Sequence, residues 1–165
     1  MKEIKFDPTS AEIIEQMRCI PTMAGLENGV LAELVRIANI RKYEAGEIII
    51  IEGANDKWLY FLVHGELEVN HQGIMLHELN RFGDMFGEMG LIDGCPRSAT
   101  VKAKTAALCL ALDASLFNGM SEANRVALKN ALNQTICENM AERLREANKK
   151  LEQCTPWPPI HLASR

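Results

Sequence analysis

An acidic residue, Glu88, and a basic residue, Arg97, stand on either side of a turn in the segment FGEMGLIDGCPRSATVKA, residues 86–103. A guanidinium can bind two phosphate oxygens in parallel. A carboxylate repels a phosphate but accepts a hydrogen bond from a hydroxyl. Gly87 permits close backbone approach, and a helical turn over EMGLID would point its first amides at an anion. The pattern therefore indicates a ligand with one phosphate and a neighbouring hydroxyl.

The same two charges also have a simpler interpretation. Glu and Arg nine residues apart across a turn often form a surface ion pair, which contributes little to stability. Residue types and spacing alone leave both interpretations open.

The segment resembles the phosphate-binding cassette of the cyclic-nucleotide-binding domain family. That pattern is F-G-E-hydrophobic-small-L, a few residues, and then P-R-small-A-T-V-x-A. The likeness extends to YEAGEIIIIEGANDKWLYFLVHGELEV, residues 43–69, and to LHELNRFGDMFGE, residues 76–88. It covers most of the chain, roughly residues 20–153. Ligand domains of bacterial catabolite activators and of kinase regulatory subunits belong to this family.

The resemblance implies a role for each matching residue. Glu88 would accept a hydrogen bond from the ribose 2′-hydroxyl, and Arg97 would pair with the cyclic phosphate. The remaining phosphate contacts would come from the backbone amides of Gly87, Met89, Ser98 and Ala99. No catalytic residue, metal or cofactor is implied, so we expect a binding protein and not an enzyme.

The base contact is expected from the last helix. Ala147 and Asn148 align with two adenine-contacting hydroxyl residues of the catabolite activators. Asn148 could contact either purine, whereas Ala147 cannot form a side-chain hydrogen bond, and Asn148 could equally be a solvated helix residue. Ser98 does not settle the base either. We expect cyclic AMP to be favoured over cyclic GMP.

Hydrophobic periodicity predicts the elements that position these residues. A helical pattern covers residues 10–41, and short strands separated by glycines follow from Tyr43, interrupted between Phe86 and Arg97. Residues 121–153 return to helix without an internal Pro or Gly. The predicted fold is mainly β with flanking helices: an eight-stranded jelly-roll β-barrel, N-terminal helices and a long C-terminal helix.

The last helix carries a second pattern. Apolar residues recur at alternating steps of three and four, at Cys137, Met140, Leu144, Ala147, Leu151 and Cys154. This spacing is typical of a coiled-coil seam and predicts a homodimer through the helix. For the first half of the helix, packing against the barrel is an equally good explanation.

Composition bounds the remaining possibilities. A chain of 165 residues with 47% hydrophobic content can bury one core. We therefore expect a single domain over 1–153, with its core at about 20–153, and a proline-rich arm over 154–165. The net charge of −4 gives no field for nucleic acid or an anionic membrane. The five cysteines are scattered and form no pattern typical of a disulfide framework, which favours a reducing compartment. The sequence also has no apolar run typical of a signal peptide or a membrane span, so we expect a cytoplasmic protein.

The sequence leaves three functions to consider. The first is a stand-alone cyclic-nucleotide sensor that signals to an unknown downstream protein through movement of its C-terminal helix. The second is a degenerate scaffold that acts through the helix without tight nucleotide binding. The third, a metal-dependent jelly-roll enzyme, is disfavoured. Such sites need two histidines at an H-x-H spacing, whereas the histidines of this chain are dispersed, at His64, His71 and His77.

Overall fold

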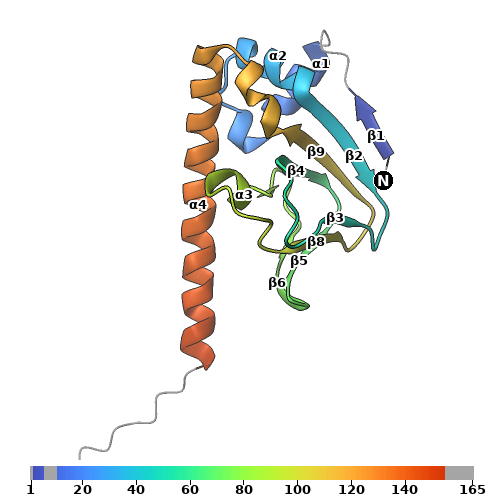
Figure 1. Cartoon of the computed structure of the whole chain (residues 1–165), viewed down its shortest axis with the longest axis vertical. Helices are drawn as coiled ribbons and strands as arrows, with labels where there is room; N and C mark the ends of the chain where they lie inside the picture. The colour runs from blue at the N-terminus through green and yellow to red at the C-terminus, as the bar shows by residue number, and fades with distance from the viewer. Residues whose placement is uncertain (1, 6–10, 155–165) are drawn as a thin grey trace, which may run out of the picture.

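A computed structural model describes residues 2–5 and 11–154. Two antiparallel sheets form its centre, and helices cover one of them (Figure 1). The larger sheet contains, in spatial order, β1 (Lys2–Lys5), β2 (Ala38–Tyr43), β9 (Ala107–Asp113), β4 (Trp58–His64) and β7 (Met85–Phe86). The smaller sheet contains β3 (Ile48–Ile50), β8 (Thr100–Ala103), β5 (Leu67–His71) and β6 (Ile74–Leu79).

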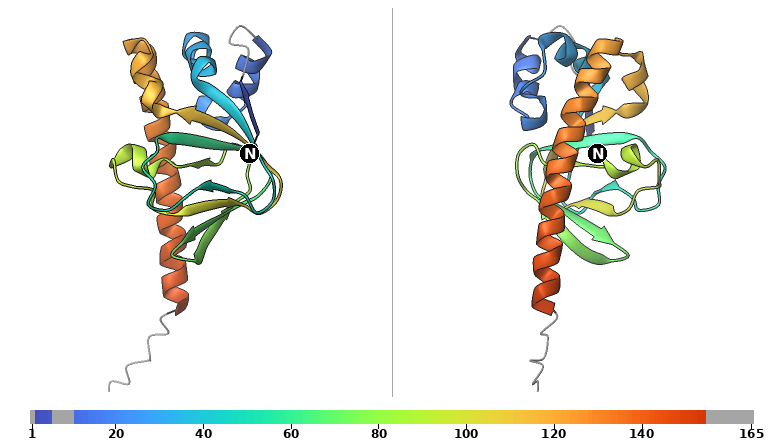
Figure 2. Two further views of the ribbon diagram at one scale, coloured as in Figure 1. Left: turned by 45° about the vertical axis from the view of Figure 1, so that its right-hand side comes forward. Right: turned by 90° about the vertical axis from the view of Figure 1, so that its left-hand side faces the viewer.

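The helices gather at the two ends of the chain, except for one turn within the cassette. They are α1 (Ala11–Arg18), the 3-10 helix η1 (Pro21–Met23), α2 (Asn28–Ile37), α3 (Met89–Ile92), the 3-10 helix η2 (Ala114–Gly119) and α4 (Glu122–Cys154). Figure 2 shows that α4 runs along one side of both sheets and continues past them.

Alternate residues of the central strands face two different cores. Tyr60 and Leu62 of β4 pack between the sheets, whereas Leu59 and Phe61 face the helices. Strand β9 divides in the same way. Because these strands are buried on both faces, their sequences read as continuous apolar runs instead of alternating ones.

The structure corrects several boundaries of the predicted fold. Helix α2 ends at Ile37, and β2 begins at Ala38, inside the predicted helical segment, because residues 38–43 pair with β9. Strand β1 was not expected, since it is short and polar, and it pairs only at the edge of β2. The described residues therefore form nine strands in two sheets; a closed eight-stranded barrel is not seen.

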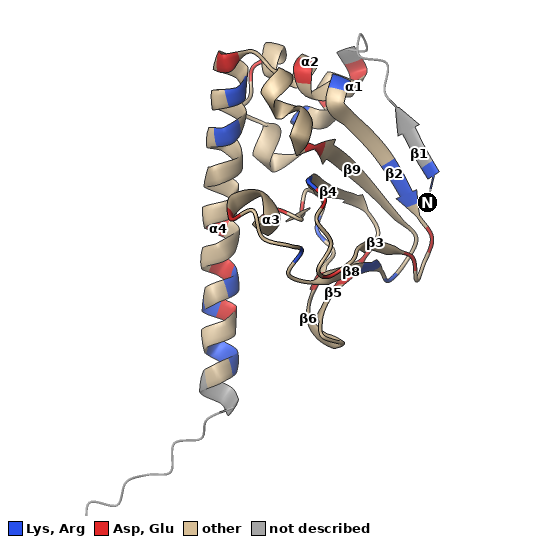
Figure 3. Ribbon diagram, in the orientation of Figure 1, with Lys and Arg blue, Asp and Glu red and all other residues tan. Residues whose placement is uncertain are grey.

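Helix α4 is attached to the rest of the chain differently in its two halves. In the first half, Leu128 and Leu132 are buried in the helical core, and Glu33 of α2 accepts hydrogen bonds from the Ser121 amide (3.0 Å) and Asn124 (2.8 Å). In the second half, charged side chains alternate along the helix (Figure 3). The predicted arm lies outside the described residues, apart from Cys154, which ends α4.

Candidate ligand-binding site

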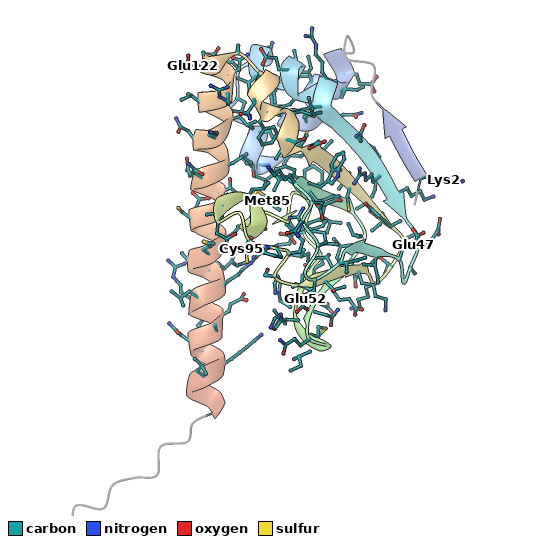
Figure 4. The ribbon with its side chains drawn as sticks, viewed as in Figure 1. Lys2, Glu47, Glu52, Met85, Cys95 and Glu122 are labelled. Carbon is teal, nitrogen blue, oxygen red and sulfur yellow. The ribbon has the colours of Figure 1, made fainter. Side chains whose placement is uncertain are left out.

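A cavity of about 590 Å³ opens between the smaller sheet, the cassette segment and α4. This volume lies within the range of small-molecule sites. Its apolar wall includes Ile50, Val69, Phe86 and Val101, and its polar wall includes Glu88, Arg97 and Arg143. Met85 and Cys95, labelled in Figure 4, lie on either side of α3 and mark the cassette beside α4.

Arg97 is held by the chain segment that precedes and begins β4. Its backbone pairs with the turn at Gly53 and Ala54 (2.8 and 2.9 Å). The residue is only 4% exposed, and Nε donates to Oδ2 of Asp56 at 3.3 Å while Nη2 donates to Oδ1. Further donations go to the carbonyls of Gly87 and Trp58. A buried guanidinium needs such partners, because an unpaired buried charge is costly.

Asp56 balances this charge. Burial by itself raises the pKa of Asp56, but hydrogen bonds from Arg97 and from the Trp58 amide (3.1 Å) outweigh burial, so the pKa lies below its ordinary value. The carboxylate is therefore ionised at neutral pH. Asp56 and Arg97 thus form an ion pair whose two charges balance.

Glu88 is the second buried charged residue of the cassette, with 3% of its surface exposed. It directly precedes α3, and its Oε1 accepts a hydrogen bond from Nη1 of Arg143 on α4 at 2.9 Å. This ion pair joins the cassette to the second half of α4. A carboxylate fixed in this way can still accept a second hydrogen bond through its other oxygen.

The structure brings together six of the seven residues predicted for the site. The cavity is lined by Gly87, Glu88, Met89, Arg97, Ser98 and Ala99. Asn148 is exposed and does not line the cavity, whereas Ala147 does. The helix residues at the cavity are Arg143, Glu146, Ala147 and Lys150. Because these residues share one face at steps of three and four, Asn148 points away from that face.

Several site residues were not found from the sequence. Asp56 lies 41 positions before Arg97 in a polar turn, and nothing local pairs the two. Arg143 had a weak signal, since it stands one helical turn before Ala147 and so shares its face. His71 and His77 were considered only as metal ligands, yet both line the cavity.

The cyclic nucleotide-binding domain model matches residues 40–124, just over half of the chain. The chain belongs to this family. It is 26% identical to the cAMP-dependent protein kinase type II regulatory subunit of Drosophila melanogaster over 159 residues, covering 96% of this chain and 40% of that protein. It is 34% identical to the regulatory subunit of Eremothecium gossypii over 89 residues, 54% of this chain and 19% of that protein. The chain thus spans less than half the length of these relatives.

Solved structures share the fold. A cyclic nucleotide-binding domain from Methylobacillus flagellatus superposes with a TM-score of 0.69 at 22% identity, covering 90% of this chain and 85% of that one. The regulatory subunit of a cAMP-independent protein kinase A from Trypanosoma brucei gives 0.67 at 21% identity, with 84% and 48% covered. These likenesses show the fold of the chain.

Two other features are absent from residues 2–5 and 11–154. Across these ranges, no cluster of His, Cys, Asp and Glu has an arrangement that could hold a metal ion. Over the same part of the chain, no helix is long and apolar enough to cross a membrane.

Gly87 offers a test of how tightly Arg97 is packed. Its φ is +82°, and an added Cβ would lie 2.9 Å from both Nη1 of Arg97 and the Trp58 carbonyl oxygen. Gly94, in the same segment, has a φ of +68° and open space around it. We expect Gly94→Ala to cost about 1–2 kcal/mol through backbone strain alone, and Gly87→Ala to cost about 1–3 kcal/mol more through the clash. Urea unfolding measures both, and equal losses would show that Arg97 is loosely held.

Proposed function

We propose that this chain binds a purine 3′,5′-cyclic nucleotide, cyclic AMP in preference to cyclic GMP, and acts as a sensor. The observation that carries the proposal is the pair of buried, oppositely charged residues, Arg97 and Glu88, that line one cavity. Such a pair suits a ligand that carries an anionic group beside a hydroxyl. A cyclic nucleotide has this arrangement in its phosphate and its ribose 2′-hydroxyl.

Arg97 would bind the cyclic phosphate without leaving Asp56. Four N–H donations to Asp56, Gly87 and Trp58 leave one Nη1 hydrogen outside the described contacts. That hydrogen and the backbone amides of the cassette would hold the phosphate oxygens. The ligand would meet a positive charge already fixed in position, which lowers the entropic cost of binding.

Glu88 would receive the ribose. Arg143 occupies its Oε1, and Oε2 would accept the hydrogen bond from the 2′-hydroxyl. Val69 and Leu76 on the sheet side and Ala147 on α4 would enclose the base. The preference for cyclic AMP draws support from the names of the kinase regulatory subunits, although a cyclic-GMP-dependent kinase of Caenorhabditis elegans is also similar over 92 residues.

The signal would leave through α4. The second half of this helix is joined to the domain by polar contacts: Arg143 to Glu88 at 2.9 Å, Arg81 to Glu142 at 3.4 Å and Lys150 to the Leu76 carbonyl at 3.4 Å. A ligand that binds Glu88 and packs on Ala147 favours one position of this half over others, in proportion to its difference in affinity for them. A downstream protein would detect that position.

Calorimetric titration of nucleotide-free protein with cyclic AMP and cyclic GMP tests the function. We expect binding of both, tighter for cyclic AMP, and a loss of about 2–5 kcal/mol in Arg97→Gln because a buried partner of the phosphate is removed. Arg145→Gln on α4 is the control, since it makes the same charge change at a residue that does not line the cavity. Failure of the wild-type protein to bind either nucleotide would refute the proposal.

The role of Glu88 is tested with a ligand that lacks the 2′-hydroxyl. Wild-type protein should bind cyclic AMP more tightly than 2′-deoxy cyclic AMP by about 1.5–3 kcal/mol, the usual contribution of a hydrogen bond to a charged group. Glu88→Gln should reduce this difference. If the variant weakens both ligands equally, Glu88 supports the cassette and does not contact the ribose.

A second candidate function rests on the exposed side of α4. Three residues of the apolar seam have large exposed fractions: Met140 41%, Leu144 62% and Leu151 63%. Ala147, the fourth, faces the cavity instead. We propose that a second copy of the chain covers this seam in a parallel homodimer. A scaffold acting through this contact alone remains the alternative to a nucleotide sensor.

Sedimentation equilibrium tests the dimer. The double variant Leu144→Asp with Leu151→Asp should be monomeric where the wild-type protein is dimeric, because charges at seam positions oppose apolar pairing. Leu116→Asp in η2 is the control, since Leu116 is 49% exposed and lies outside α4. A wild-type mass equal to one chain would remove the dimer from the account.

A further inference from the structure

A second arginine is buried beside the ligand site without lining it. Arg41 on β2 is 8% exposed, and it is not among the residues around the cavity. Removing a guanidinium from water is costly unless other groups compensate for the lost hydration. The groups that contact Arg41 therefore show what the buried charge stabilises.

Arg41 contacts two alternate side chains of β4. Its guanidinium carbon lies 3.7 Å from the centre of the Trp58 ring, and its Nη1 donates a hydrogen bond to the Tyr60 hydroxyl oxygen at 2.9 Å. A cation over an aromatic face is attracted to the ring, more strongly where water is excluded. Because a guanidinium is planar, it can stack on one ring and donate to another group at the same time. Arg41 thus holds Trp58 and Tyr60 together.

The backbone of Trp58 contacts both members of the buried ion pair in the site. Its amide donates to Oδ1 of Asp56 at 3.1 Å, and its carbonyl oxygen accepts a hydrogen bond from Nη2 of Arg97. A shift of the Trp58 backbone would therefore move an acceptor of Arg97 and loosen the carboxylate that balances its charge.

Tyr60 supports the other side of the same guanidinium. Its ring stacks on Phe86 of β7, with 5.0 Å between the ring centres and 10° between the planes, and the two residues are partners in the strand register. Phe86 lines the cavity and directly precedes Gly87, whose carbonyl oxygen accepts from Nη1 of Arg97. The two contacts of Arg41 therefore lead to two different acceptors of Arg97.

We propose that Arg41 is a positioning residue for the ligand site: through Trp58 and Tyr60 it fixes the two backbone carbonyls to which Arg97 donates. Its effect on affinity rests on the proposed binding of a cyclic nucleotide, in which Arg97 meets the phosphate. Arg41 itself does not touch the ligand. It keeps the guanidinium of Arg97 in one orientation before the ligand binds, and such preorganisation lowers the cost of binding.

Calorimetric titration with cyclic AMP tests the effect on affinity. We expect Arg41→Met to weaken binding roughly three- to thirty-fold. Arg41→Lys, which keeps a charge near Trp58 but lacks the planar fork, should lose less. The same change made in an Arg97→Lys background should alter the affinity less than two-fold, because that side chain no longer has the fork that Arg41 positions.

Val35→Ala in α2 is the control for lost stability. Val35 is 1% exposed, belongs to the helical core and does not line the cavity. This variant should lower the unfolding temperature because it removes buried apolar contacts. It should bind cyclic AMP as the wild-type protein does.

Nuclear magnetic resonance tests the positioning without a ligand. The Nε–H group of Arg97 donates to Asp56, so its ¹⁵N–¹H peak reports the geometry of that hydrogen bond. The peak is assigned by its absence in Arg97→Lys. In the free protein we expect Arg41→Met to shift or broaden it, and Val35→Ala to leave it in place.

Three results would each overturn the positioning role. They are an unmoved Arg97 peak in Arg41→Met, an equal loss of affinity from Arg41→Met in the wild-type and Arg97→Lys backgrounds, and a loss of affinity in Val35→Ala as large as that in Arg41→Met. If the wild-type protein binds no cyclic nucleotide, the proposed function fails instead, and the resonance of Arg97 in the free protein still decides whether Arg41 positions it.

Discussion

The buried guanidinium of Arg97 is the constraint on which the ligand site depends. A charge with only 4% exposure must have fixed partners, and these come from the chain just before β4 and from the cassette itself. The requirement explains Gly87, since only a residue without a side chain leaves room for both Nη1 and the Trp58 carbonyl. It also explains Asp56, whose carboxylate balances the charge of the guanidinium.

Helix α4 is held in two different ways along its length. Apolar burial fixes its first half through residues such as Leu128, and this part of the helix is a fixed element of the fold. The second half meets the domain through polar contacts, among them the ion pair of the buried Glu88 with Arg143 at the cavity. The helix thus combines a half anchored by apolar packing with a half held by polar contacts.

The sequence predicted local features well and long-range ones poorly. The cassette could be recognised because Glu88, Arg97 and the residues beside them are contiguous, and β4 and β9 because their apolar runs are bounded by turns. Arg143 and His77 reach the cavity, and Asp56 reaches Arg97, only through tertiary packing. Apart from the helical spacing of Arg143 and Ala147, no local pattern indicated these residues. Strand pairing likewise overrode the helical pattern after Ile37. The alignment of the last helix placed Asn148 at the base, whereas the helix rotation places Ala147 at the cavity and Asn148 on the outside.

A crystal structure of the chain with cyclic AMP tests the central claim most directly. The account predicts a phosphate oxygen within about 3 Å of a guanidinium nitrogen of Arg97, with Asp56 still paired to the opposite edge of the same group. Either of two results would contradict the account. The nucleotide could bind outside the cavity, or its phosphate could lie beyond hydrogen-bonding distance of Arg97 while Arg97 keeps its present partners.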